Sequence, residues 1–312
     1  MISRREFLGA VAVALPALRS LGPLAANEWG SPVFDLHFHL RPDPAANLAH
    51  LDGAGITAAN LLTRGDALES VKALQTAAPG RFTWFASQDV TNPDAEQRLT
   101  QSVHDGAQGF GELKFHVAAD GPELRRVYAL GADLRVPLLI HFQEVDHFPG
   151  EGTWSTGYAR TFASILEAYP RTTFIGHADA FWANVSADYR NEAAYPTGPI
   201  ARGGITDKLL GDHPNLFGDL SANSGHNALS RDAAFTADFL GRHEDKLLFG
   251  SDCSCTDGRG RGVSQSHNPA ATRLAGKCVA RETLSLLKRT ASDDVFRKIV
   301  WGNAHRLLRI PV

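Results

Sequence analysis

The stretch FDLHFHL, residues 34–40, alternates strictly between apolar and polar side chains. A period of two is typical of a β-strand that has one apolar face and one polar face. The polar face of this strand would carry one carboxylate and two imidazoles, those of Asp35, His37 and His39. Such a face either contacts water or binds a ligand, and the rest of the sequence has to decide between the two.

The run at 33–40 is the first of a series of short β-rich runs. The series continues at 56–62, 82–89, 109–116, 136–144, 172–179, 215–222 and 246–252. Consecutive runs are far enough apart for a helical crossover, which parallel strands require. The eightfold repeat predicts an α/β fold, a single (β/α)8 TIM barrel with its active site at the C-terminal ends of the strands. An open, doubly wound sheet is the alternative.

Amphipathic stretches lie between several of these runs, with apolar residues at intervals of three and four. They predict helices that begin near Ala67, Pro93, Pro122, Ala159 and Ser230. Asp94 and Ser230 are good N-cap residues, and Pro93 and Pro122 suit helix beginnings.

Residues 1–26 are predicted to be an export signal that precedes a barrel domain at 27–312. Arg4 and Arg5 precede an apolar run, and Ala25 and Ala26 suit a signal-peptidase site. The order SRREFL resembles the twin-arginine export signal. We therefore expect recognition by the twin-arginine export machinery and a periplasmic or secreted protein, with an ordinary secretory signal or a retained anchor as alternatives. The apolar run is short for a membrane span, so stable membrane insertion is not expected.

The formal net charge of −3 and the scarcity of basic clusters argue against nucleic acid as the main partner. The sequence leaves open whether the chain forms a homo-oligomer. Of the three cysteines, Cys253 or Cys255 could form a disulfide with Cys278 in an exported protein. A Cys-x-Cys pair alone is weak evidence for a metal site.

Ionisable residues recur near the C-terminal ends of the predicted strands, which meet at one mouth of a barrel. They are His37 and His39, then Glu112 and Lys114, then His141, His177 and Asp252. Buried ionisable groups need partners, because the interior of a barrel is otherwise apolar. A divalent cation is the simplest shared partner, and imidazole with carboxylate suits zinc, with manganese or iron as alternatives.

This pattern resembles the amidohydrolase superfamily and, more narrowly, the amidohydrolase 2 family of metal-dependent hydrolases and decarboxylases. The matching pieces are DLHFHL (35–40), LLIHF (138–142), FIGHAD (174–179), NLFGDLSA (215–222), LLFGSD (247–252) and WGNAHRLL (301–308). The resemblance implies that the last piece is structural, with Asn303 fixing backbone near the barrel and Leu307 and Leu308 packing.

The same resemblance implies roles for single residues. His37, His39 and His141 would be metal ligands. His177 would be a ligand in a two-metal site, or a catalytic or substrate-orienting group in a one-metal site. Asp252 would touch the metal and handle the proton of its water.

The number of metal ions depends on the stretch GELKF, residues 111–115. Two-metal members of the superfamily bridge their ions with a glutamate or a carbamylated lysine, and Glu112 and Lys114 offer both. An ion pair between Glu112 and Lys114 beside a single cation is the alternative. The expectation is therefore one or two ions per chain.

The predicted activity is metal-dependent hydrolysis of a lactone, ester or amide bond in a small organic substrate by a metal-activated water. Non-oxidative decarboxylation of an unsaturated or aromatic acid is the alternative, and a non-catalytic metal-binding barrel is a third possibility. Residues near the predicted mouth that could orient the substrate are Arg64, Gln88, Glu144 and His226.

Overall fold

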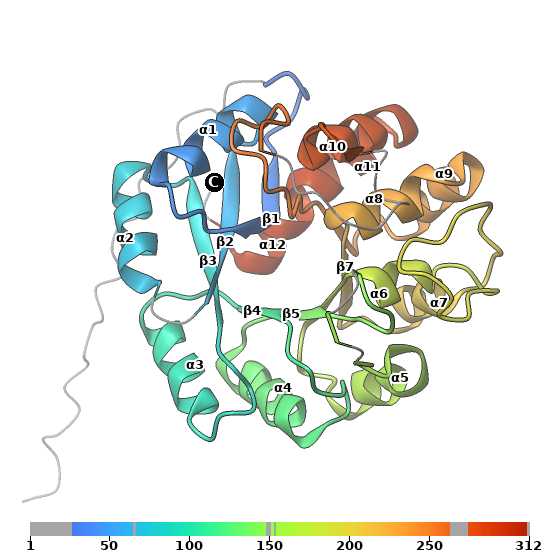
Figure 1. Ribbon diagram of the computed structural model, residues 1–312, viewed down its shortest axis with the longest axis horizontal. Coiled ribbons are helices and arrows are strands. Elements are labelled where there is room, and N and C mark those ends of the chain that lie inside the picture. Colours follow the sequence, from blue (N-terminus) through green and yellow to red (C-terminus); the bar gives the residue numbers. More distant parts are fainter. Residues whose placement is uncertain (1–26, 65–66, 148–150, 153, 263–273, 311–312) are drawn as a thin grey trace, which may run out of the picture.

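The computed structural model describes residues 27–64, 67–147, 151–152, 154–262 and 274–310. The predicted export signal at 1–26 lies outside the described residues. Within them, strands and helices alternate along the chain, and the helices surround the strands (Figure 1). No described helix is both long enough and apolar enough to cross a membrane.

The strands form a single parallel sheet of eight strands in sequence order, which confirms the predicted (β/α)8 barrel and excludes the doubly wound sheet. They are β1 (Phe34–His39), β2 (Ala58–Arg64), β3 (Phe82–Ser87), β4 (Phe110–Leu113), β5 (Leu138–His141), β6 (Phe174–His177), β7 (Leu216–Asp219) and β8 (Leu247–Leu248). The backbone N–H of Leu36 donates to the carbonyl of Phe249 over 3.0 Å, and this bond brings the first strand against the chain that follows the last.

The helices between and after the strands vary in length. They are α1 (Pro44–Ala54), α2 (Leu68–Ala77), α3 (Ala95–His104), α4 (Pro122–Leu134), α5 (Tyr158–Ala168), α6 (Asp179–Ala183), α7 (Ile205–Asp212), α8 (Ala222–Ser230), α9 (Ala233–Arg242), α10 (Val279–Thr290), α11 (Asp293–Arg297) and α12 (Asn303–Leu308), with a π-helical turn η2 (Lys298–Gly302) between the last two.

The helix beginnings agree only in part with the sequence. Pro122 is the first residue of α4, as predicted, whereas Pro93 precedes α3, which begins at Ala95. The predicted N-cap at Ser230 is wrong, because Ser230 ends α8. Asp232 caps α9 instead, and its side chain accepts a hydrogen bond from the backbone N–H of Phe235.

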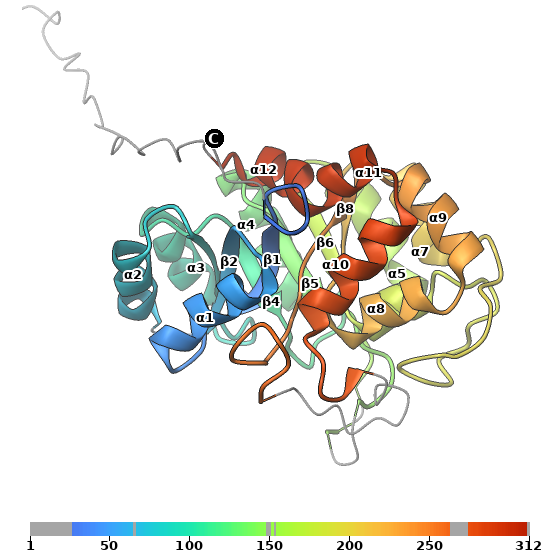
Figure 2. The same cartoon turned by 90° about the horizontal axis from the view of Figure 1, so that it is seen from above.

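Buried apolar side chains from the strands and from α12 form a cluster of their own. We call this group the floor cluster; it includes Leu62, Phe85, Leu139, Ile175, Leu248, Ala304 and Leu308. Helix α12 supplies the last two residues, and it lies on the opposite side of the barrel from the loop 253–262 in Figure 2. Asn303 donates to the carbonyls of Glu244 and Leu247 over 2.7 and 2.8 Å, so it fixes the backbone at β8 as expected.

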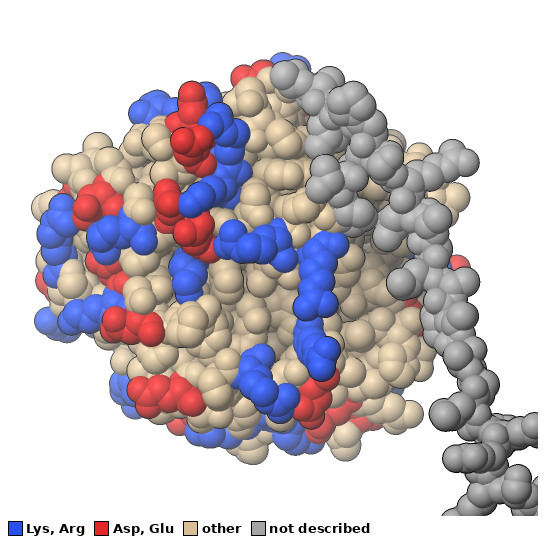
Figure 3. Space-filling model, turned by 180° about the vertical axis from the view of Figure 1, so that it is seen from behind, with Lys and Arg blue, Asp and Glu red and all other residues tan. Residues whose placement is uncertain are grey.

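The outer surface carries charges of both signs. On the face shown in Figure 3, lysine and arginine side chains are interspersed with aspartate and glutamate. Mixed charges of this kind are typical of a solvated surface.

Candidate active site

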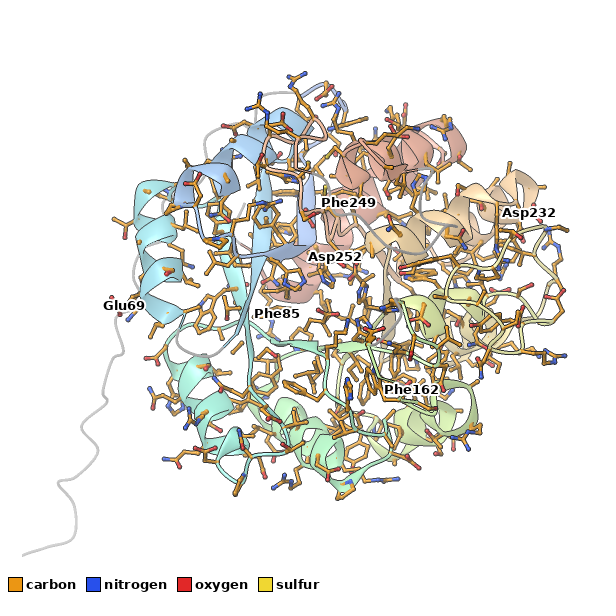
Figure 4. The ribbon with its side chains drawn as sticks, in the orientation of Figure 1. Glu69, Phe85, Phe162, Asp232, Phe249 and Asp252 are labelled. Carbon is orange, nitrogen blue, oxygen red and sulfur yellow. The ribbon has the colours of Figure 1, made fainter. Side chains whose placement is uncertain are left out.

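Candidate ligands from the first strand and from the segment after the last strand meet at the mouth of the barrel. His37 and His39 follow each other on β1, and their Nε2 atoms lie 3.3 Å apart. Asp252 Oδ1 lies 3.8 Å from His37 Nε2 and 3.3 Å from His39 Nε2. Asp252 lies inside the ring of strands in Figure 4, whereas Glu69 and Asp232 lie at the periphery. His37 and His39 therefore both face the mouth of the barrel, where His37 is buried and the side chain of His39 is 42% exposed.

Glu112 joins this group to the histidines of β5 and β6. Its Oε2 atom lies 3.5 Å from His39 Nε2 and 4.0 Å from His37 Nε2. Its Oε1 atom lies 2.5 Å from His141 Nδ1 and 3.6 Å from His177 Nε2. One carboxylate thus presents a separate oxygen to each of two pairs of histidines.

The glycine before Glu112 allows this placement. Gly111 has φ +150°, and a side chain at this position would bring a Cβ within 2.8 Å of Leu139 Cβ and 3.0 Å of its carbonyl oxygen. Strand β4 can therefore approach β5 closely only with glycine here. The close approach brings Glu112 to His141.

Asp219, at the end of β7, contacts the Nδ1 atoms of His37 and His177. Its Oδ2 atom lies 2.7 Å from His37 Nδ1 and 3.3 Å from His177 Nδ1, and it accepts a hydrogen bond from Ser221 Oγ over 2.7 Å. A carboxylate on Nδ1 keeps that nitrogen protonated and leaves Nε2 free to face a cation. We did not predict Asp219 from the sequence, although its strand end, FGD, resembles the FGSD that carries Asp252.

Asp35 precedes an irregularity in the register of β1, and its side chain holds backbone rather than a metal-ligating side chain. Its Oδ1 atom accepts from the backbone N–H groups of His37, over 3.1 Å, and Ser251, over 2.8 Å. The backbone N–H of Asp252 in turn donates to the carbonyl of His37 over 2.8 Å. These bonds fix the ends of β1 and β8 side by side. Burial raises the pKa of Asp35 to about 6.

The electrostatics of the mouth favour a bound cation. Burial alone would lower the pKa of His37, but the carboxylates of Asp252, Asp219 and Glu112 outweigh it and raise that pKa to about 10. Burial would raise the pKa of Glu112, yet the surrounding imidazoles hold it well below its usual range. Burial lowers the pKa of His141 to about 4 despite Glu112, so this imidazole is neutral. The mouth therefore attracts positive charge. A divalent cation that displaced the proton of His37 would find ionised carboxylates and the neutral imidazole of His141 as further donors.

Two overlapping sets of donors are compact enough to hold an ion. One consists of His37, His39 and Glu112, and the other of Glu112, His141 and His177. In each set the donor atoms lie within 4.8 Å of one another. A third set, of His37, His177 and Asp252, connects the two.

Lys114 lies outside this network. Its Nζ atom lies 3.6 Å from Glu151 Oε1, and among the residues that the structure describes no ion pair joins it to Glu112. The alternative of a Glu112–Lys114 ion pair is therefore wrong. Of the two candidate bridges, Glu112 lies among the histidines and Lys114 does not.

The candidate substrate-binding residues occupy different positions. Arg64 is the last residue of β2, but its side chain lies outside the described part of the chain. Gln88 follows β3 and is half-buried. His226 is buried on α8, with Nδ1 3.3 Å from Thr283 Oγ1 on α10. This contact places His226 where two helices pack.

Glu144, which follows β5, accepts hydrogen bonds from within the next loop. Its carboxylate accepts from the hydroxyl of Ser155, from Thr156 Oγ1 over 2.9 Å and from the backbone N–H of Tyr158 over 2.9 Å. Through these bonds Glu144 stabilises the loop that precedes α5. Its carboxylate therefore has a local structural role.

Aromatic residues that we did not predict line one side of the mouth. The ring of Trp154 stacks on His116, with ring centroids 5.1 Å apart, and lies nearly parallel to His141 at 6.4 Å. His147 Nε2 lies 2.6 Å from Asp179 Oδ1 beside them. A tryptophan in an unpatterned loop gives no periodic signal, so only the fold places it at the site.

A family comparison agrees with this geometry. Residues 38–310 match the amidohydrolase family. The chain belongs to this family. No curated protein matches the chain significantly.

Solved structures resemble the amidohydrolase over most of its length. Dihydroorotase from Campylobacter jejuni has 16% identity and a TM-score of 0.55, covering 90% of this chain and 84% of the other. 2,6-Dihydroxybenzoate decarboxylase from Rhizobium has 15% identity and a TM-score of 0.52, covering 89% and 99%. A TatD homologue from Escherichia coli K12 has 14% identity and a TM-score of 0.52, covering 89% and 98%. At such identities the likeness shows the shared fold.

Proposed function

We propose that this amidohydrolase is a metal-dependent hydrolase that cleaves a lactone, ester or amide bond in a small organic substrate. The observation that carries the proposal is the placement of Glu112, whose two oxygens face separate pairs of histidines. A bridging carboxylate of this kind suits two divalent cations that share one site, with zinc as the preferred ion and manganese or iron as alternatives.

The residues divide between two ion positions. His37, His39 and Asp252 would hold one cation, His141 and His177 the other, and Glu112 would bridge them. When bound, the cations would activate water and polarise the scissile carbonyl.

Asp252 is the proposed proton carrier. Burial would raise its pKa, but His37 and His39 lower it, so the carboxylate is ionised and can accept a proton. Its backbone has φ +46°, a conformation held by the hydrogen bond from its N–H to the carbonyl of His37. It would take a proton from the attacking water and deliver it to the leaving oxygen or nitrogen as the carbonyl–heteroatom bond breaks.

Asp219 would position the imidazoles during this reaction. Because its carboxylate binds Nδ1 of His37 and lies close to Nδ1 of His177, both rings keep Nε2 turned toward the reacting centre. A cavity of about 420 Å³ adjoins His39 and Asp252. This volume is in the range of small-molecule sites.

Metal analysis of the purified full chain tests the bridge. We expect the Glu112→Gln variant to lose at least one equivalent of metal relative to the wild type, together with hydrolysis of a panel of lactones, esters and amides. Glu69→Gln is the matched control, because the Glu69 side chain is 90% exposed on α2. Equal metal content in wild type and Glu112→Gln would contradict the bridge. Release of CO2 from aromatic acids, without hydrolysis of the panel, would favour the decarboxylase alternative.

We also propose that residues 1–26 direct export by the twin-arginine route, which places the hydrolase in the periplasm or outside the cell. The support is the sequence SRREFL followed by an apolar run. The double variant Arg4→Lys, Arg5→Lys should accumulate unprocessed in the cytoplasm, as measured by cell fractionation. Unchanged export of this variant would point to another route.

A further inference from the structure

A second group of metal-binding side chains lies beside the mouth, and the proposed hydrolysis does not use it. It consists of Cys253 and Cys255 after β8, Cys278 at the N-cap of α10 and His50 on α1. All four residues are buried, and one potential ligand atom from each lies within 4.8 Å of the others. We call this group the thiol cluster.

The distances within the thiol cluster fit a tetrahedral ion. Cys253 Sγ lies 3.4 Å from Cys255 Sγ and 3.8 Å from Cys278 Sγ, and His50 Nδ1 lies 3.4 Å from Cys255 Sγ. A tetrahedron with Zn–S bonds of about 2.3 Å places its sulfurs about 3.8 Å apart. Three sulfurs and one imidazole are a known donor set for structural zinc.

The surroundings of the cluster supply a compensating charge. Arg41 donates from Nη2 to the carbonyls of Cys253, over 2.6 Å, and Cys255, over 3.0 Å. Its Nε and Nη1 atoms are buried and have no hydrogen-bond partner among the described residues. A divalent ion with three thiolates and a neutral imidazole has one net negative charge. The buried guanidinium would balance that charge.

The loop that carries two of the cysteines packs closely on α1. At Gly258, with φ +65°, an added Cβ would lie 2.3 Å from the carbonyl oxygen of His50, so the loop lies directly on α1. This close packing brings His50 to the cysteines.

A disulfide explains the cluster less well. It would use two of the three sulfurs and leave the third outside the bond, although all three belong to one buried group with His50. His50 Nδ1 lies 2.8 Å from the carbonyl oxygen of Cys255 and 3.4 Å from its sulfur, so metal binding at Nδ1 would replace the hydrogen bond from this nitrogen to the carbonyl.

We propose that His50, Cys253, Cys255 and Cys278 bind one zinc ion in a closed structural site, separate from the catalytic centre. The ion would tie α1 and the N-terminus of α10 to the loop that begins directly after Asp252. Its task would be to fix that loop, and the site would stabilise the folded chain whether or not the catalytic ions are bound.

The first test uses the full chain purified with zinc and then loaded with Co²⁺. Thiolate-bound cobalt absorbs in the near ultraviolet through sulfur-to-metal charge transfer. We expect this band in the wild type and in the Glu112→Gln variant, and its loss in Cys278→Ser, which should also contain one zinc less and melt at a lower temperature. Equal zinc content in wild type and Cys278→Ser, or no band in the wild type, would overturn the proposal.

A second test needs no variant that could fail to fold. Titration of the native wild-type protein with a mercurial reagent should release one zinc as its three cysteines react. Reaction of all three thiols without zinc release would overturn the proposal. So would an intact mass of the metal-free native protein that shows a disulfide. Neither result depends on catalysis, so failure here is distinguishable from failure of the proposed hydrolysis.

Discussion

The two ends of the barrel interior use the same strand faces for opposite purposes. On β5, Leu139 lies in the floor cluster and His141, two residues later, lies at the mouth. On β6, Ile175 and His177 repeat this arrangement. On each of these strands, the residue in the apolar layer and the candidate metal ligand are thus only two positions apart. The floor stabilises the fold, whereas the mouth places buried charges that only other charges or a cation can satisfy.

The two ends therefore differ in how they affect the free energy of folding. Apolar side chains at the floor gain stability by leaving water, at roughly 25 cal/mol per Å² of buried surface. Carboxylates at the mouth lose hydration, and hydrogen bonds such as that between Asp219 and His37 offset this loss. Mutations at the mouth should change chemistry with little change in stability, and mutations at the floor should do the reverse.

The largest expected effect is at Asp252. Asp252→Asn removes the proposed proton acceptor but keeps the size of the side chain, so kcat should fall by about 10²- to 10⁴-fold. The melting temperature should stay close to that of the wild type. Steady-state kinetics and thermal unfolding check the two parts. Asp293→Asn, at an aspartate whose side chain is 71% exposed, is the control. An active Asp252→Asn enzyme would remove the proposed role of this residue.

The floor should give the complementary result. Leu308→Ala removes a buried side chain from the floor cluster and should lower the free energy of unfolding by about 2–5 kcal/mol. The kcat of the folded fraction should not change. Denaturant titration measures the first quantity, and Leu307→Ala, at a half-buried neighbour, should cost less. A loss of kcat in folded Leu308→Ala would show that the two ends are coupled.

An intermediate effect on metal affinity and activity is expected at Asp219. Asp219→Asn keeps the shape of the side chain but weakens its hold on the Nδ1 protons of His37 and His177. We expect a loss of about 10- to 100-fold in metal affinity or activity. Metal titration and kinetics measure it, and Ser221→Ala should show a smaller loss in the same direction. Wild-type metal affinity in Asp219→Asn would mean that the imidazoles are oriented without it.

The smallest expected effect is at Glu144. Glu144→Gln weakens charge-assisted hydrogen bonds to the loop before α5 and should lower the free energy of unfolding by about 1 kcal/mol. The KM should not change if the carboxylate only braces this loop. A large rise in KM with unchanged stability would instead support the role in substrate binding that the sequence suggested.

The sequence predicted the barrel because each strand has its own local pattern of β-rich residues between turn signals. It also indicated His37, His39, His141, His177 and Asp252 as candidates, because each lies near the C-terminal end of a predicted strand. Ser230 was misplaced because α8, with the sequence ANSGHNALS, contains Gly, Ser and two Asn, which are poor helix formers. That helix was therefore not recognised.

Other parts of the site could not be predicted because they depend on packing between distant segments. Asp219 has the local appearance of an aspartate at a turn, and only the closed barrel places it behind His37. The thiol cluster is a stronger example, since His50 meets Cys255 across 205 residues of sequence. A Cys-x-Cys pair and a helical histidine give no signal that connects them before the fold is known.

The bond between Asp35 and the backbone of Ser251 has a consequence for the order of folding. It joins residues 216 apart in the sequence, and the contact between His37 and Asp219 spans 182. Such long-range contacts form late, because the entropy of closing a long loop must first be overcome. Until β8 docks beside β1, Asp252 is not held beside His37 and His39. The catalytic ligand set is thus completed by the last topological step of folding, and an unclosed chain should bind the catalytic ions far more weakly.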